Sequence, residues 1–219
     1  GRVFADLRRY PKLVGGLGDR GAHRAVSFYE QALQFDERVD LSRANGVWDL
    51  GSAEAAEMAK LAETTYRDVN IGLANQFARF AAANGIDIHK VIEASNSQPY
   101  SHLHQPGMSV GGHCIPVYPR LYLWNDPDAT VMRAARAANA GMPAYTVGLA
   151  AGAAGDELSG KRVVVLGAAY RGGAKETAFS GVFAAVDELA GRGAVVMVHD
   201  PLYTDEELAR RGWAPYHFG

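Results

Sequence analysis

The chain has 219 residues, of which 48% are apolar and 21% are charged. This is the balance of an ordinary globular protein with one large or two small cores, and it excludes a disordered chain. The formal net charge of -2 provides no basic field for nucleic acid or anionic lipid, so bound phosphates would be held locally. One cysteine, no secretory signal pattern and no apolar run of bilayer length predict a cytoplasmic protein without a membrane segment.

Apolar spacing in the first quarter of the chain predicts short elements separated by glycine-rich turns. The expected elements are a helix over residues 1–10, a strand over 11–16, a helix over 22–33, and two strands over 37–41 and 46–50.

A long helix is predicted over residues 53–83, because Ser52 can cap it and no proline interrupts the run before Pro99. Such a helix would be about 45 Å long, which exceeds the width of a small domain. Apolar residues at three- and four-residue spacing give it one face that we expect to be buried. That stripe consists of Met58, Leu61, Thr65, Val69, Leu73, Phe77 and Phe80.

The second half of the chain predicts more helices and then a β–α–β unit. Its expected elements are helices over 86–95, 129–140 and 142–154, a strand over 161–167, a helix over 180–191 and a strand over 195–199. Gly167 follows the first of these strands, but a single glycine is a weak dinucleotide-binding signal.

The stretch Gln-Pro-Gly-Met-Ser-Val-Gly-Gly-His-Cys-Ile-Pro, residues 105–116, contains the only cysteine. Its glycines and prolines describe a rigid turn whose backbone can approach a ligand closely. A lone cysteine is more often a small buried hydrophobic residue. The paired glycine before Cys114 indicates instead a thiol that faces a ligand, and thiolates are strong nucleophiles.

This stretch also resembles the catalytic-cysteine segment of the nucleotide-sugar 6-dehydrogenases, the UDP-glucose/GDP-mannose dehydrogenase family. Gly-Gly-His-Cys-Ile-Pro is most similar to the UDP-N-acetylmannosamine and UDP-N-acetylglucosamine dehydrogenases, and residues 59–71 resemble the family's active-site helix. The resemblance implies an α/β fold: residues 1–51 as the end of a Rossmann-like NAD domain, 52–158 as a central helical region, and 159–219 as the start of a second Rossmann-like, UDP-binding domain. It also implies a homodimer through the 53–83 helix.

The activity that the resemblance implies is NAD-dependent oxidation of a UDP-sugar, a UDP-N-acetylhexosamine in particular, at C6. Two hydride transfers would pass through a thioester on Cys114, with Lys60 stabilising the oxyanion and Thr64 orienting it or the water. Substrate-binding positions carried over are Leu103, His104, Gly107 and Gly111, with Arg171 and Lys175 as diphosphate partners.

The resemblance implies that the family's complete NAD domain would precede residue 1 and that the rest of the second domain's sheet would follow residue 219. The chain is therefore expected to be truncated at both ends. We expect no Gly-x-Gly-x-x-Gly fingerprint behind a strand, and NAD-binding residues are left unassigned.

Departures from the family pattern leave alternatives open. Thr64 stands where the family usually has asparagine, Tyr118 where it has aspartate, and Ala178 where it has arginine. A UDP-sugar-binding paralogue with impaired catalysis is therefore one alternative, and a UDP-glucose 6-dehydrogenase is another. A metal-binding module of His102, His104, His113 and Cys114 is a third, but the last two are adjacent in sequence, which is awkward for chelating one ion, so we expect no metal.

Overall fold

The computed structural model describes residues 3–218, and the chain divides into two compact units. The first unit ends at Glu63 and the second begins at Thr64. The first unit holds α1 (Val3–Arg9), β1 (Lys12–Val14), α2 (Asp19–Ala32), β2 (Val47–Asp49) and the start of α3 (Ala53–Ala83). β1 and β2 are parallel, with Leu13 opposite Trp48, and α2 contacts both, which makes a small β–α–β unit.

The strand predicted over residues 37–41 is wrong. The segment is an irregular turn in which Arg38 pairs with the carboxylate of Asp40 and donates to the carbonyl of Arg9. Val39, the apolar residue at its centre, is 95% exposed. Because nothing covers Val39, alternating polarity alone does not make this segment a strand.

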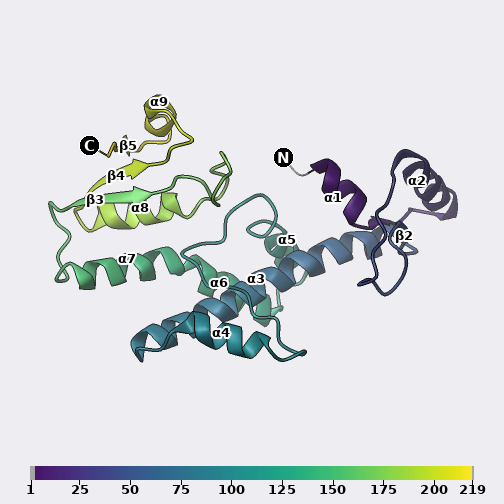
Figure 1. Cartoon of the computed structure of the whole chain (residues 1–219), viewed down its shortest axis with the longest axis horizontal. Helices are drawn as coiled ribbons and strands as arrows, with labels where there is room; N and C mark the ends of the chain where they lie inside the picture. The colour runs from purple at the N-terminus through teal and green to yellow at the C-terminus, as the bar shows by residue number, and fades with distance from the viewer. Residues whose placement is uncertain (1–2, 219) are drawn as a thin grey trace. The chain divides into compact units, whose positions relative to one another are not determined.

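The second unit continues α3 and adds most of the remaining structure. Its elements are α4 (Ile88–Asn96), α5 (Tyr118–Asn125), α6 (Thr130–Ala140), α7 (Met142–Ala153), β3 (Arg162–Leu166), α8 (Val182–Gly191), β4 (Val195–His199), α9 (Asp205–Ala209) and β5 (Ala214–Pro215). β3, β4 and β5 form a parallel sheet in that order, and α8 lies between this sheet and α7 (Figure 1). Helices over parallel sheets confirm the predicted α/β class.

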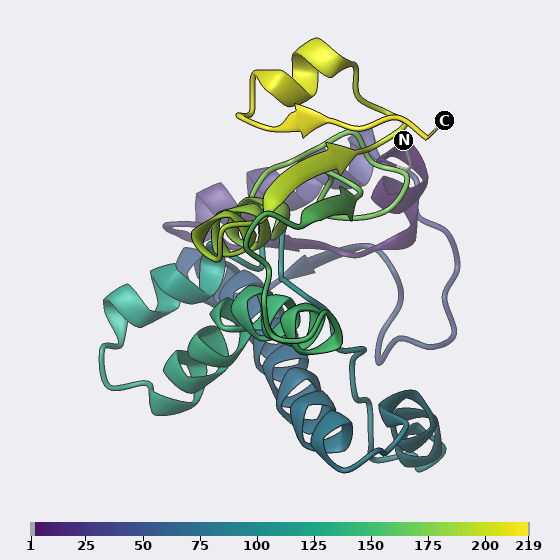
Figure 2. The same cartoon turned by 90° about the vertical axis from the view of Figure 1, so that its left-hand side faces the viewer.

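Helices α5 and α9 and strand β5 were not predicted. α5 and α6 form an adjacent pair in Figure 2, and α5 begins at a proline-containing first turn. α9 follows Thr204, whose hydroxyl accepts the N–H of Glu207 while the Glu207 carboxylate accepts the N–H of Thr204. This capping box is readable in the sequence as Thr-x-x-Glu and was available as a helix signal.

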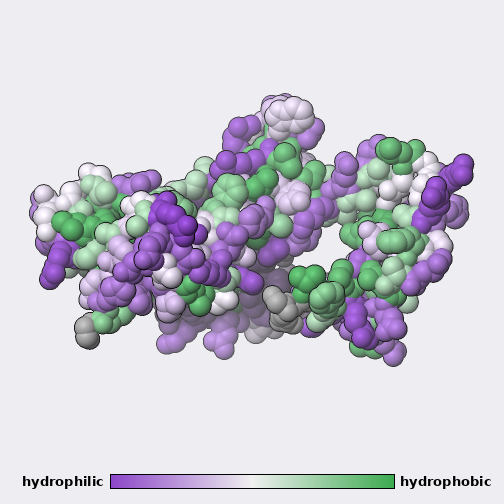
Figure 3. All heavy atoms as spheres, turned by 90° about the horizontal axis from the view of Figure 1, so that it is seen from above, coloured by the Kyte–Doolittle hydropathy of each residue, from purple (hydrophilic) through white to green (hydrophobic). Residues whose placement is uncertain are grey.

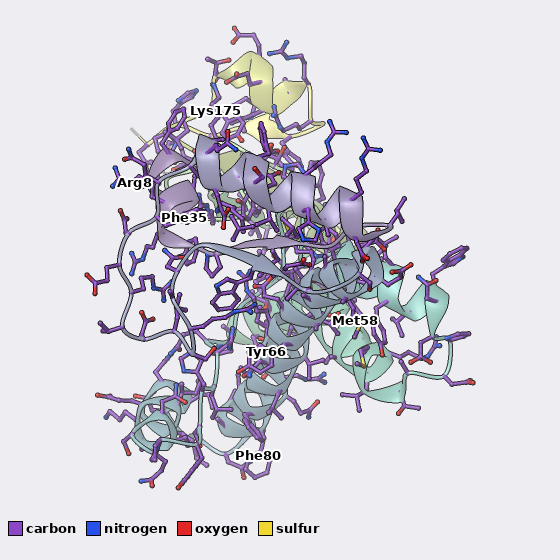
Figure 4. The ribbon with its side chains drawn as sticks, turned by 90° about the vertical axis from the view of Figure 1, so that its right-hand side faces the viewer. Arg8, Phe35, Met58, Tyr66, Phe80 and Lys175 are labelled. Carbon is purple, nitrogen blue, oxygen red and sulfur yellow. The ribbon has the colours of Figure 1, made fainter. Side chains whose placement is uncertain are left out.

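The predicted helix over 53–83 is confirmed at both ends, but its predicted buried stripe is largely wrong. Met58 and Phe80, labelled in Figure 4, are 47% and 65% exposed, and Leu73 and Phe77 are exposed as well. The buried residues of α3 are small or polar: Thr64, Thr65, Asp68, Gly72, Ala74, Asn75 and Ala81. The reason is α6, since a Cβ on Gly72 would lie 3.1 Å from the Cα of Ala135.

The surface mixes polar and apolar residues, as the face drawn in Figure 3 shows. Within residues 3–218, none of the helices combines the length and the hydropathy that crossing a bilayer requires. The division at residues 51 and 158 stays a prediction.

Candidate functional site

Cys114 lies in the turn that leads into α5. Its carbonyl oxygen accepts the N–H of Val117 at 3.0 Å and of Tyr118 at 2.9 Å. The residue is partly exposed and is not in a disulfide. A partly exposed thiol on a hydrogen-bonded turn has the access that a reactive cysteine requires.

The paired glycines before Cys114 bring this loop against the loop that follows β3. The N–H of Gly112 donates to the carbonyl of Ala178 at 2.9 Å, and Gly112 has a φ of 91°. A Cβ on Gly111 would lie 2.5 Å from the Cβ of Tyr170 and 2.9 Å from the carbonyl oxygen of Phe179. Glycine at 111 is therefore a condition of the contact between the two loops.

An exposed pair adds a second link between these loops. His113 Nε2 lies 3.2 Å from Glu176 Oε2, and Glu176 Oε1 accepts the N–H of Ala178 at 2.8 Å. The Ala178 amide and then His113 lower the pKa of the Glu176 carboxyl. Because both side chains are exposed, this pair adds little stability.

A cavity of about 640 Å³ opens at the carboxyl edge of β3 and β4. Its walls come from the loop before Cys114, the turn after β3, the start of α8 and the end of β4. The polar lining residues are Ser109, Tyr170, Arg171, Ser180 and Asp200. Ligands of open α/β sheets bind at this edge, and the Arg171 guanidinium favours an anionic one.

Asp200 fixes the backbone of this cavity. Its carboxylate accepts the N–H of Ala168 at 2.8 Å and of Leu202 at 2.9 Å, so it joins the turn after β3 to the end of β4. The sequence alone did not indicate this role of Asp200.

The two basic residues predicted to meet a diphosphate are placed differently. Arg171 lines the cavity. Lys175, labelled in Figure 4, is outside the lining, with its Nζ 2.7 Å from Glu207 Oε2 and 5.3 Å from the ring centre of Tyr203. Glu207 balances the Lys175 charge, so Arg171 has the stronger geometric support.

Three of the other predicted substrate-binding residues, Leu103, His104 and Gly107, have backbone groups that bond asparagine side chains. Leu103 donates its N–H to Asn96 Oδ1 at 2.7 Å and accepts from Asn96 Nδ2 at 2.9 Å. The N–H of His104 donates to Asn70 Oδ1 at 3.2 Å. These bonds fix the path of the loop that leads to Gly107 and Gly111.

Lys60 and Thr64 follow one another at four-residue spacing on α3. Lys60 belongs to the first unit and has its Nζ 3.5 Å from Glu63 Oε2, whereas Thr64 begins the second unit and is fully buried. Their catalytic roles stay predictions.

The four residues of the alternative metal site do not converge. His113 pairs with Glu176, while the rings of His102 and His104 are 6.1 Å apart. Across residues 3–218, no three histidine, cysteine, aspartate or glutamate side chains form a group that could hold a metal ion.

Comparisons with known proteins agree on one family. The family described as the UDP-glucose/GDP-mannose dehydrogenase family, central domain, matches residues 54–141. UDP-N-acetyl-D-mannosamine dehydrogenase of Pyrococcus horikoshii is 37% identical over 205 residues, which are 92% of this chain and 46% of that protein. The chain belongs to the UDP-glucose/GDP-mannose dehydrogenase family.

Other relatives in this family give the same result. The enzyme of the same name from Methanocaldococcus jannaschii is 32% identical over 94% of this chain and 45% of its own length. The solved structure of the Pyrococcus horikoshii enzyme superimposes with a TM-score of 0.82 at 32% identity, covering 95% of this chain and 50% of that one. The chain thus spans less than half the length of these curated relatives.

The prediction of no dinucleotide-binding glycine motif behind a strand is wrong for the first unit. Gly16, Gly18 and Gly21 form a Gly-x-Gly-x-x-Gly motif behind β1 and at the start of α2. The surroundings do not suit the pyrophosphate of NAD: Asp19 places a carboxylate in the first turn of α2, and the Gly21 N–H donates to the Gly18 carbonyl at 2.9 Å. We assign no cofactor-binding residue to this motif.

His104 makes the stability of the second unit depend on pH. Burial, the largest cause, lowers the pKa of His104, whose Nδ1 has no hydrogen-bond partner among the described residues. Below about pH 6.5, the ordinary pKa of histidine, the unfolded chain therefore binds more protons than the folded chain. The free energy of unfolding consequently falls as the pH drops from there through the lower pKa of His104 in the folded chain. We expect His104→Gln to reduce the fall in melting temperature between about pH 7.5 and pH 5.

Proposed function

We propose that the protein containing this chain oxidises a UDP-N-acetylhexosamine, UDP-N-acetylmannosamine in the first instance, at C6 to the uronate. The observation that carries the proposal is the accessible Cys114 on a loop that also walls the anion-favouring cavity. Relatives that are UDP-N-acetyl-D-mannosamine dehydrogenases support this substrate.

The reaction removes four electrons from the C6 alcohol and adds one water. NAD⁺ supplies the oxidising power as a co-substrate, two molecules accepting one hydride each. The Cys114 thiolate adds to the C6 aldehyde carbon, forming a C–S bond and an oxyanion that the Lys60 ammonium stabilises. Once oxidised, this adduct is a thioester, and water replaces the sulfur, releasing the carboxylate and the thiol. Thr64 would donate its hydroxyl to the oxyanion or to that water.

The cavity would hold the UDP group. The Arg171 guanidinium suits a diphosphate, and Lys175 would contribute only if it left Glu207. The loop through Leu103, His104, Gly107 and Gly111 would then carry the sugar toward Cys114. Exposed Leu73, Phe77 and Phe80 on α3 support a homodimer through that helix.

A binding paralogue without turnover is the second candidate, and Tyr118, four residues after Cys114, favours it because it stands where the family usually has an aspartate. The deciding experiment measures NADH formation by the intact protein with UDP-N-acetylmannosamine, UDP-N-acetylglucosamine and UDP-glucose, alongside calorimetric binding of each. Turnover of one sugar supports the dehydrogenase and identifies its substrate. Binding without turnover supports the paralogue, and absence of both contradicts the two.

A further inference from the structure

A buried polar network lies between α3 and α6. Asp68 is 0% exposed, Asn75 1% and Asn139 2%, and the Arg136 side chain is 14% exposed. Burying four such side chains is costly unless each is hydrogen-bonded. The arrangement of their bonds indicates what they serve.

One end of the network holds the residue that follows Cys114. Arg136 Nη1 donates to Asp68 Oδ1 at 2.9 Å and to the carbonyl oxygen of Ile115 at 3.3 Å. The guanidinium thereby ties the backbone beside the thiol to a fully buried carboxylate. Both bonds come from the same nitrogen, so a lysine ammonium at this position could make them in part.

The other end holds the start of the same loop. Gly107 donates its N–H to Asn75 Oδ1 at 2.9 Å, and Asn75 Nδ2 donates to Asn139 Oδ1 at 2.8 Å. Asn139 Nδ2 then donates to Asp68 Oδ1 at 2.8 Å and to the Asp68 carbonyl at 2.9 Å. The bonds run unbroken from Gly107 to Ile115, with Asn139 as the central link.

Stability alone is a weak reason for such a network. Asp68 Oδ2 is buried without a hydrogen-bond partner among the described residues, and burial raises the pKa of Asp68 although Arg136 opposes it. Well-packed apolar residues often replace a buried ion pair without loss of stability. What apolar residues could not do is bond the N–H of Gly107 and the carbonyl of Ile115.

We propose that Asp68, Asn75, Arg136 and Asn139 are positioning residues that fix both ends of the 107–115 loop and thereby place Cys114 for attack. None of their hydrogen bonds involves Cys114 itself, so they act through the loop backbone. The catalytic consequence rests on the proposed dehydrogenase function. The effect on the loop does not.

Asn139→Ala is the sharpest variant, because Asn139 is bonded to neither end of the loop. If the network acts as one unit, its loss should loosen both ends. Hydrogen exchange of the intact protein reports this through the Gly107 amide at one end and the Val117 and Tyr118 amides at the other. We expect exchange about tenfold faster at both ends. The matched control is Asn125→Ala on α5, whose exposed amide donates only to the Leu121 carbonyl at 2.9 Å.

Two further measurements separate positioning from general stability. In Asn139→Ala, kcat for NADH formation should fall about 100-fold while KM for the UDP-sugar changes less than about threefold. Arg136→Lys keeps the charge beside Asp68 and should recover part of the kcat lost in Arg136→Met. If the network had a purely structural role, kcat would change only in proportion to the melting temperature. Arg136→Lys would then recover no kcat beyond what its melting temperature accounts for.

The outcomes are distinct. Unchanged exchange at either end in Asn139→Ala contradicts the network, and faster exchange with wild-type kcat contradicts positioning. If the wild-type protein has no turnover, the proposed function fails. Iodoacetamide alkylation of Cys114, the only cysteine, then replaces kcat, and a wild-type alkylation rate in the loosened variant contradicts positioning. If Asn139→Ala does not fold, Asn75→Ala, which should loosen the Gly107 end first, takes its place.

Discussion

Replacing Cys114 with alanine is expected to reduce NADH formation by on the order of 10⁴-fold, because the variant has no atom to form the thioester. UDP-sugar binding should be retained, since the cavity lining does not include Cys114. NADH absorbance during the reaction with the preferred UDP-sugar measures turnover. Calorimetry of UDP-sugar with the same variant measures binding.

Cys114→Ser is the matched variant for this prediction. Serine keeps the size and the turn but has a much weaker nucleophile near neutral pH, so it should resemble alanine in rate. Retention of more than about a tenth of wild-type turnover by the alanine variant would contradict covalent catalysis. Loss of UDP-sugar binding in both variants would show instead that the side chain supports the turn.

The long helix shows what the sequence could and could not predict. Local signals, Ser52 before it and the absence of proline within it, determine its ends, and the structure has it at Ala53–Ala83. The buried face depends on a partner 63 residues away, because Ala135 of α6 packs on Gly72. Within the chain, most of the predicted apolar stripe is therefore exposed, and small or polar residues of α3 are buried instead.

The site shows the same contrast. Glycine spacing directed attention to Cys114, but the partners of those glycines, Tyr170 and Phe179, come from the loop after β3. Asp68 and Arg136 read in the sequence as ordinary surface charges, and only their contact across 68 residues makes them a buried pair. Lys175 is the reverse case, since its predicted role did not anticipate Glu207.

Replacing Gly111 with alanine is expected to lower the free energy of unfolding by about 2–3 kcal/mol. The new Cβ would lie 2.5 Å from the Tyr170 Cβ and 2.9 Å from the Phe179 carbonyl oxygen, and neither is the mobile end of a side chain. The two loops must therefore separate, which stretches the Gly112 N–H bond to the Ala178 carbonyl. UDP-sugar affinity should fall with stability, because Ser109 and Tyr170 on those loops line the cavity.

Gly148→Ala in α7 is the matched control, since a Cβ at Gly148 would meet no atom within 4 Å. Alanine there should stabilise the helix by up to about 1 kcal/mol, so an equal loss in both variants under urea denaturation would contradict the steric argument. Adding Tyr170→Gly to Gly111→Ala removes the closer clash and leaves the Phe179 oxygen at 2.9 Å. The double variant should therefore lose less than the sum of the two single losses, which identifies the loop contact itself as the source of the destabilisation.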